Sequence, residues 1–144
     1  MNKIYVVYWS QTGNTQAMAE AVGRGIEEAG MEAEVVAVSR ITVEELKDAP
    51  AFALGCPAMG DEVLEESEME PFMEQLDAVI SGKQIGLFGS YGWGDGRWMR
   101  DWQERVTADG ASVIGKEGVI AQEAPDDGVV EACCNLGKAL AAAR

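Results

Sequence analysis

Histidine is absent from this chain of 144 residues. Without an imidazole, the protein lacks the commonest general base and the commonest metal ligand found in proteins. A Ser–His–Asp triad and a zinc–water hydrolase built on histidine are therefore excluded. From this composition we expect no metal site.

Positive charge is also scarce, since 11 lysines and arginines stand against 25 aspartates and glutamates, a net charge of −14. Such a chain offers no basic surface to nucleic acid and no attraction to anionic membranes. A protein partner that recognises it through charge would be basic. The apolar run in the first ten residues, MNKIYVVYWS, is too short for a signal peptide or a membrane span.

Cysteine is limited to Cys56, Cys133 and Cys134, which form no Cys-x-x-Cys pair and no zinc spacing. We interpret all three as reduced thiols that act as small apolar residues, which predicts a cytoplasmic location. Proline is scarce as well, at 4 residues, whereas 47% of the chain is hydrophobic. The length suits one domain, residues 1–144, with a core of its own, and we expect a monomer.

Apolar runs alternate with amphipathic stripes along the whole chain. Buried strands are predicted at 3–9, 33–38, 51–56, 84–90 and 111–121, the last of them kinked at Gly115. Helices are predicted at 14–29, 68–80, 97–109 and from about Pro125 to the end. This alternation indicates an α/β fold with a parallel sheet covered on both faces, and ligands bind such sheets at the carboxyl ends of the strands.

The loop after the first predicted strand, residues 10–15 (SQTGNT), has the features of a phosphate-binding loop. It offers hydroxyls, a side-chain amide, a flexible glycine and the free N–H groups of a helix start. No lysine follows the glycine, so it is not a Walker A loop, and an ordinary helix cap is the alternative. No basic residue lies between Lys3 and Arg24, so a phosphate bound here would keep its charge uncompensated.

The loops after the third and fourth predicted strands offer surfaces for a flat ligand. Met59 is polarizable and Gly60 can rotate its peptide, although a plain turn with a core-facing methionine is the alternative. In the next loop, Trp93 stands among three glycines at positions 92, 94 and 96. An indole on so flexible a loop favours stacking against an aromatic ligand.

Three segments, VVYWSQTGNT (6–15), LGCPAMGDEVLEESEMEPF (54–72) and GLFGSYGWGDGRWMRDW (86–102), resemble the short-chain flavodoxins, above all those of clostridia and related anaerobes. The similarity continues more weakly to the carboxyl terminus and so covers the whole chain. It implies a doubly wound sheet of five parallel strands in the order 2-1-3-4-5, for which flavodoxins are a standard example. It also implies a non-covalent FMN at the switch point between strands one and three.

The resemblance further implies a role for each loop. The first loop would hold the FMN phosphate, although Gln11 replaces the small residue common in the family and would contribute its backbone N–H. Met59 and Trp93 would enclose the isoalloxazine ring, Gly60 would offer its carbonyl to N5, and Glu62 would accept a hydrogen bond from N3–H. Backbone groups would line the ribityl and pyrimidine side. The predicted FMN-binding residues are Ser10, Gln11, Thr12, Gly13, Asn14, Thr15, Pro57, Ala58, Met59, Gly60, Glu62, Ser90, Tyr91, Gly92, Trp93 and Gly94.

The implied function is one-electron transfer at low potential between redox enzymes, without a substrate of the protein's own. Between Asp61 and Gly82 the chain has eight carboxylates and no lysine or arginine, a charge that would disfavour an anionic reduced flavin and attract basic partners. The alternative is an FMN-dependent NAD(P)H:quinone reductase of the same fold, for whose additional pocket the chain leaves little room. A response-regulator receiver domain is discarded, because Ser10, Gln11 and Cys56 stand where its acidic residues are required.

Overall fold

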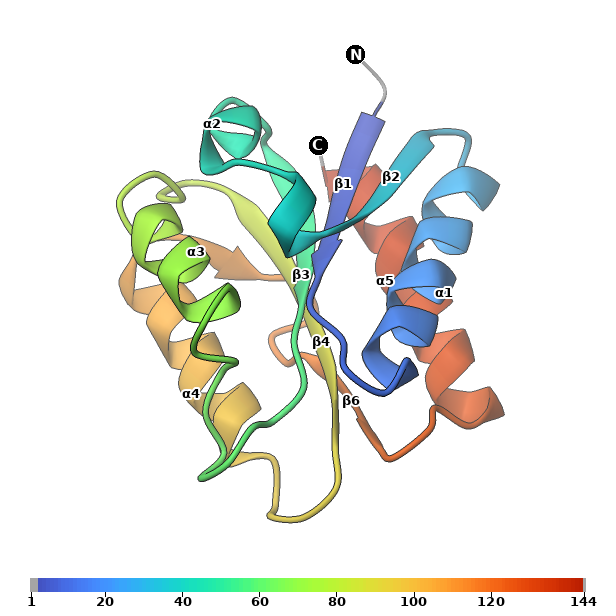
Figure 1. Cartoon of the computed structure of the whole chain (residues 1–144). Coiled ribbons are helices and arrows are strands. Elements are labelled where there is room, and N and C mark those ends of the chain that lie inside the picture. Colours follow the sequence, from blue (N-terminus) through green and yellow to red (C-terminus); the bar gives the residue numbers. More distant parts are fainter. Residues whose placement is uncertain (1–2, 144) are drawn as a thin grey trace.

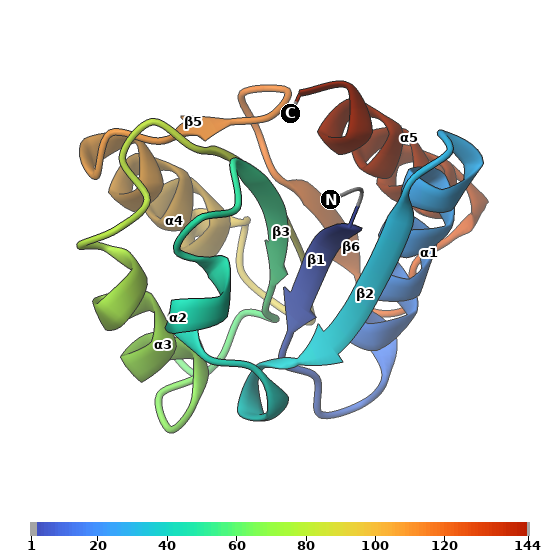
Figure 2. The same ribbon diagram turned by 90° about the horizontal axis from the view of Figure 1, so that it is seen from above.

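The structure is a computed structural model that describes residues 3–143. Within this range, one sheet contains the strands β1 (Lys3–Tyr8), β2 (Glu32–Ala37), β3 (Ala51–Gly55), β4 (Gln84–Tyr91), β5 (Ser112–Val113) and β6 (Val119–Gln122). The helices are α1 (Asn14–Glu28), α2 (Val43–Leu46), α3 (Met69–Leu76), α4 (Arg97–Ala108) and α5 (Asp127–Ala143), with a 3₁₀ turn η1 at Val38–Arg40. Helices α1 and α5 cover one face of the sheet, and α2, α3 and α4 cover the other (Figures 1 and 2).

The strands lie in the order β2-β1-β3-β4-β5, and all of their pairings are parallel. This confirms the predicted order 2-1-3-4-5. The chain runs outward from β1 to β2 and then crosses back to β3, so the direction of winding reverses between β1 and β3. The loops that follow these two strands diverge at this point, which opens the crevice where ligands of doubly wound sheets bind.

The fifth position of the sheet differs from the single strand predicted at 111–121. Two short strands, β5 and β6, occupy it, and both pair with β4. The chain leaves the sheet between them because Gly115 and Lys116 adopt φ values of 76° and 70°, outside the range of a strand. The kink expected at Gly115 is therefore a complete turn, and β6 resumes pairing near the carboxyl end of β4.

Two apolar layers hold the helices against the sheet. Strand β3 is buried over its entire length, as expected for a central parallel strand. Phe52 packs toward α3 and α4 together with Trp98 and Trp102 of α4, whereas Val6 and Phe88 pack toward α1 and α5. Complete burial of side chains of this size contributes about 1.5–3 kcal/mol each. This packing makes the sheet a rigid support for the loops at its edge.

The helix boundaries differ from the prediction mainly at α2 and α3. The sequence pattern did not predict α2, a single turn that begins with a capping box between Thr42 and Glu45. Helix α3 ends at Leu76, four residues before the predicted end at 80. Helix α5 begins at Asp127, because Asp126 caps it through a 2.9 Å bond from the N–H of Val129 to Oδ1. None of the helices within residues 3–143 has the length and apolar character needed to cross a membrane.

Candidate functional site

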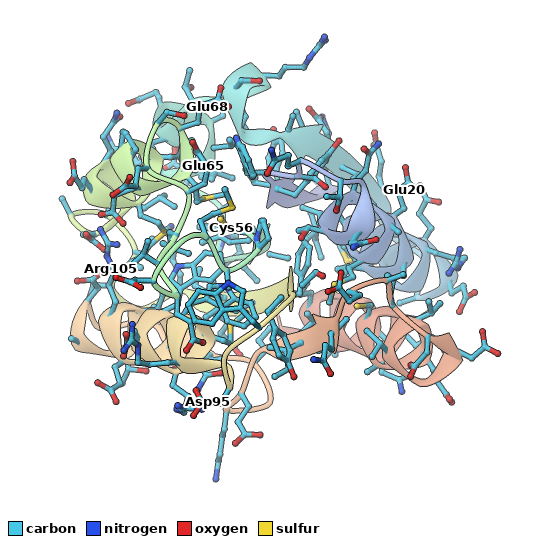
Figure 3. The ribbon with its side chains drawn as sticks, turned by 60° about the horizontal axis from the view of Figure 1, so that its bottom comes forward. Glu20, Cys56, Glu65, Glu68, Asp95 and Arg105 are labelled. Carbon is cyan, nitrogen blue, oxygen red and sulfur yellow. The ribbon has the colours of Figure 1, made fainter. Side chains whose placement is uncertain are left out.

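A cavity of about 200 Å³ opens at the carboxyl ends of the strands, the lower end of the molecule in Figure 1, which Figure 3 brings forward. Loops that follow β1, β3, β4 and β6 line it. The lining residues are Ser10, Gln11, Thr12, Asn14, Thr15, Pro57, Ala58, Met59, Ser90, Tyr91, Gly92 and Glu123. All of them except Glu123 are among the predicted binding residues. The fold thus brings together residues that the sequence places in three separate segments.

One corner of the cavity is formed by the amino terminus of α1. Gly13 precedes the helix at φ 97° and has no side chain with which to cap it. The Ser10 hydroxyl turns back to accept hydrogen bonds from the N–H groups of Gly13 (3.1 Å) and Gln16 (3.3 Å). The first turn of α1 contains no acidic residue, so the partial positive charge of the helix end is uncompensated at the cavity.

Thr15 adds an unpartnered donor to this corner. Its side chain is only 1% exposed, and its Oγ1 atom has no hydrogen-bond partner among residues 3–143. An unsatisfied buried hydroxyl costs about 1–3 kcal/mol, so such groups are rare unless a ligand satisfies them. Together with the helix terminus, this hydroxyl fits a phosphate and requires no cation.

The loop after β3 forms a tight turn at the edge of the cavity. Met59 and Val63 exchange two backbone hydrogen bonds, of 2.9 and 3.0 Å, across the turn. Met59 is half-buried and lines the cavity, so its alternative interpretation as a core residue is wrong. Gly60 has φ 48°, a conformation that favours glycine, and a Cβ atom there would meet nothing within 4 Å. The strain of a side chain at position 60 would therefore come from the backbone alone.

Glu62 lies outside the cavity lining, with its carboxylate at the start of α4. Oε1 accepts hydrogen bonds from the N–H groups of Gly96 (3.1 Å) and Arg97 (2.7 Å), so it caps a helix that has no capping side chain of its own. Oε2 makes no hydrogen bond within the described chain. Gly94 leaves room for the carboxylate, because a Cβ atom there would lie 2.6 Å from Cδ of Glu62.

Trp93 projects into solvent at the outer rim, and its side chain is 64% exposed. Its neighbour Tyr91 is instead held against Trp98 of α4, with the ring centroids 5.6 Å apart. Asp95, labelled in Figure 3, lies on the same loop and forms a 3.1 Å ion pair with Arg100. An exposed indole of this kind leaves a large apolar surface free for a flat ligand or a partner.

The segment between this turn and α3 is organised by a buried carboxylate, Glu65, labelled in Figure 3. It accepts hydrogen bonds from the N–H groups of Ser67, Glu68 and Met69 at 2.8, 2.8 and 3.0 Å. Burial alone would raise the pKa of Glu65, but these bonds and that of the Ser67 hydroxyl outweigh it and lower the pKa. The carboxylate therefore stays charged and fixes the start of α3.

Two further side chains join this segment to the rest of the site. The N–H of Glu65 donates to the Cys56 thiol at 3.4 Å, and burial raises the pKa of that thiol to about 12, so it stays protonated. The Trp9 indole, which follows β1, donates to Glu68 at 2.9 Å. The segment between the 59–63 turn and α3 is thus anchored to the residues that follow both β1 and β3.

Comparison with known proteins identifies the family. A family model for flavodoxins matches residues 6–137. The chain is 49% identical to a flavodoxin of Clostridium beijerinckii over 94% of its own length and 97% of the relative's. It is 44% identical to a flavodoxin of Megasphaera elsdenii, with 97% and 99% covered. The chain belongs to the flavodoxin family.

The solved structure of the two-electron reduced Megasphaera elsdenii flavodoxin superposes on this fold with a TM-score of 0.89. Membership in this family makes the chain an FMN-binding electron-transfer protein and not an enzyme with its own substrate. The residues present fit the cofactor, because the unpartnered Thr15 hydroxyl and the uncompensated end of α1 suit its phosphate. The NAD(P)H:quinone reductase alternative gains no support over the electron carrier from these relatives.

The structure groups the predicted binding residues in two sets. Eleven line the cavity, and the other five, Gly13, Gly60, Glu62, Trp93 and Gly94, lie outside its lining. Sequence reasoning missed Glu123, which follows β6 at φ 61°. Its N–H donates to the Tyr91 carbonyl at 2.8 Å, and its carbonyl accepts from the Ser90 hydroxyl at 2.7 Å. Glu123 lies just after the strand predicted at 111–121, and this position at a strand end is the signal that could have found it.

Proposed function

We propose that this protein carries single electrons at low potential between redox enzymes, with a non-covalent FMN held by residues 10–15, 57–62 and 90–94. The observation that carries the proposal is the start of α1, where the helix end and the unpartnered Thr15 hydroxyl suit a phosphate without a basic residue. The many carboxylates between Asp61 and Gly82 add to it. FMN supplies a ring that accepts and releases electrons one at a time, and the chain supplies the environment that sets how readily it does so.

The phosphate end of FMN would be held by neutral donors. The Thr15 hydroxyl has no partner within the described chain, and Ser10 already orders the N–H groups at the start of α1. Hydrogen bonds to a charged acceptor of this kind contribute about 1.5–3 kcal/mol each. Gln11 is exposed and lines the cavity, so it can add its backbone N–H.

The ring end would be enclosed by Met59 and Trp93, which excludes water from part of the flavin surface. Gly60 follows Met59 in the turn, and a Cβ atom there would meet nothing within 4 Å. Because glycine tolerates both signs of φ, the carbonyl of Gly60 can rotate at low cost. Glu62 caps α4 through Oε1 alone, which leaves Oε2 available to accept from N3–H. Backbone groups of Ala58, Ser90, Tyr91 and Gly92 would line the ribityl chain.

The carboxylates between Asp61 and Gly82 would lower the reduction potential of the bound flavin and favour basic partner proteins. A carboxylate about 10 Å from an anionic ring opposes it by on the order of 1–2 kcal/mol at an effective dielectric constant near 20. Glu65 and Glu66 line a second hollow next to Met59 and Gly60 of the turn. Glu70 and Asp77 instead share the single positive charge of Arg105, through ion pairs of 2.9 and 2.8 Å. The same unpaired charge would attract redox proteins that carry a basic patch.

We also propose that the protein works as a monomer in a reducing compartment, the cytoplasm. Cys56, Cys133 and Cys134 are free thiols, and burial raises the pKa of Cys56 and of Cys133 to about 12, which suits residues without redox chemistry of their own.

Stepwise anaerobic reduction of the purified protein tests this proposal. We expect a flavin spectrum, two separate one-electron steps, and electron transfer to a basic acceptor protein that slows as ionic strength rises. Rapid oxidation of NAD(P)H by the protein alone would contradict the carrier and favour the reductase. Transfer rates that do not depend on ionic strength would contradict the basic partner.

A further inference from the structure

The turn Gly60–Asp61–Glu62 is tied to the start of α4 by hydrogen bonds in both directions. The Glu62 carboxylate accepts from the backbone N–H of Arg97, 35 residues further along the chain, at 2.7 Å. In return, Nη2 of the Arg97 guanidinium donates to the carbonyl oxygen of Asp61. We refer to this reciprocal pair of contacts as the Glu62–Arg97 clamp.

The clamp restrains the turn on one side, and the backbone restrains it at the base. The two hydrogen bonds between Met59 and Val63 close the turn at 2.9 and 3.0 Å. The Asp61 carbonyl is held by Arg97 and the Glu62 side chain by α4. Neither the Gly60 carbonyl nor the Asp61 N–H has a hydrogen-bond partner among residues 3–143. The peptide between these two residues is therefore the part of the turn that no hydrogen bond restrains.

Two features of the loop before α4 are matched to this clamp. Gly96 precedes the helix at φ 91° and provides no side-chain cap, so Glu62 supplies the missing acceptor from another loop. Gly94, at φ 92°, leaves the space that the carboxylate occupies. The clamp consequently fixes the 90–96 loop and the 59–63 turn relative to one another.

We propose that Arg97 is a positioning residue for the cofactor-facing turn, acting through the Asp61 carbonyl so that only the Gly60–Asp61 peptide is free to rotate. The proposal rests on the proposed function in one respect, that this turn faces FMN. Arg97 thereby restricts the motion of the 59–63 turn to the Gly60–Asp61 peptide, whose orientation would affect the bound ring.

The test compares Arg97→Gln with a matched control, Arg100→Gln. Both arginines lie in the first turn of α4, both side chains are 54% exposed, and both substitutions remove one positive charge. Arg100 contacts Asp95 and not the turn. Arg97→Lys retains the charge with a single donor group and is expected to restore most of the wild-type behaviour.

Amide hydrogen exchange of the FMN-free protein, measured by NMR, is the first readout. We expect the Val63 amide to exchange about tenfold faster in Arg97→Gln, because the turn opens more often without the clamp. In Arg100→Gln and Arg97→Lys its rate should change less than threefold. Equal rates in all proteins, or equal acceleration in both glutamine variants, would overturn the proposal.

The second readout is the potential of the first one-electron step in the FMN-loaded proteins. Both glutamine variants lose one positive charge, but Arg97 lies nearer the turn, so the potentials are compared at high ionic strength, where salt screens the difference in distance and the remaining difference is the positioning effect. We expect the equilibrium constant of this step to change about threefold more in Arg97→Gln, a difference of roughly 30 mV. Equal shifts would show an effect of charge alone and overturn the proposal. A wild-type protein that binds no FMN would overturn the proposed function, while the exchange measurement would still decide whether the clamp exists.

Discussion

Replacing Thr15 by valine tests the phosphate corner of the site, because the two side chains have nearly the same shape and differ in one hydroxyl. In the FMN-free protein this hydroxyl is buried and unpartnered, so its removal relieves a desolvation penalty. We expect the free energy of unfolding to stay the same or to rise by up to about 1 kcal/mol. FMN binding would lose one hydrogen bond to a charged phosphate, about 1.5–3 kcal/mol, which corresponds to a roughly 10- to 150-fold higher dissociation constant.

Fluorescence titration with FMN and with riboflavin gives the comparison that decides the role of Thr15. Riboflavin has the same ring and ribityl chain but no phosphate, so its affinity should change less than threefold. Thr107→Val, an exposed position on α4 far from the cavity lining, serves as the control for the substitution itself. Equal losses for FMN and riboflavin would show that Thr15 supports the shape of the cavity and not the phosphate, and would refute the reasoning.

Three further predictions concern the turn, a carboxyl pair and a helix crossing. Gly60→Ala should lower the first one-electron potential of bound FMN by roughly 40–130 mV, measured by redox titration, because the rotated peptide becomes strained by about 1–3 kcal/mol; an unchanged potential would contradict this. Burial, together with the hydrogen bond and negative charge of Asp77, raises the pKa of Asp109 from 3.8 to about 6, so the folded state binds its proton more tightly than the unfolded state. The stability that Asp109 contributes is fully present below about pH 4 and is lost as the pH rises through 6. Asp109→Asn should remove that decline and stabilise the protein at pH 7 by up to about 1 kcal/mol after solvent screening. Urea unfolding across this pH range measures both effects. Gly137→Ala should destabilise the fold by about 1–3 kcal/mol in thermal unfolding, since its Cβ would lie 2.1 Å from the Val22 carbonyl oxygen, whereas Gly128→Ala in the same helix, with 3.5 Å to its nearest contact, should change stability by less than about 1 kcal/mol.

The local patterns predicted most of the sheet and the cavity because these features depend on neighbouring residues in the chain. The apolar run of β3 and the stripe of α1 indicate buried elements wherever they pack, and the loops at 10–15 and 57–60 follow strand ends that parallel pairing places at one edge. The fifth strand was predicted less well, since an apolar run does not report the φ values at Gly115 and Lys116 that divide it. Helix α2 was missed because a single capped turn has no measurable periodicity.

The roles that escaped the prediction are those that depend on a distant partner. Glu62 is one of the predicted binding residues, but the sequence did not predict that it caps a helix that begins 35 residues away, or that Arg97 holds a carbonyl in another loop. Glu123 enters the cavity because β6 pairs with β4, which places its loop beside Ser90 and Tyr91.

By itself, the sequence determined the acidic charge, the absence of imidazole chemistry, the alternation of strands and helices, and the three loops with their hydroxyls, sulfur and indole. These follow from composition and short-range periodicity, which act within a few residues. Only the tertiary structure decided that Thr15 is buried without a partner, that Oε1 of Glu62 is already occupied, and that Arg105 forms ion pairs with both Glu70 and Asp77. Burial and pairing are properties of segments brought together by folding, and no local pattern encodes them.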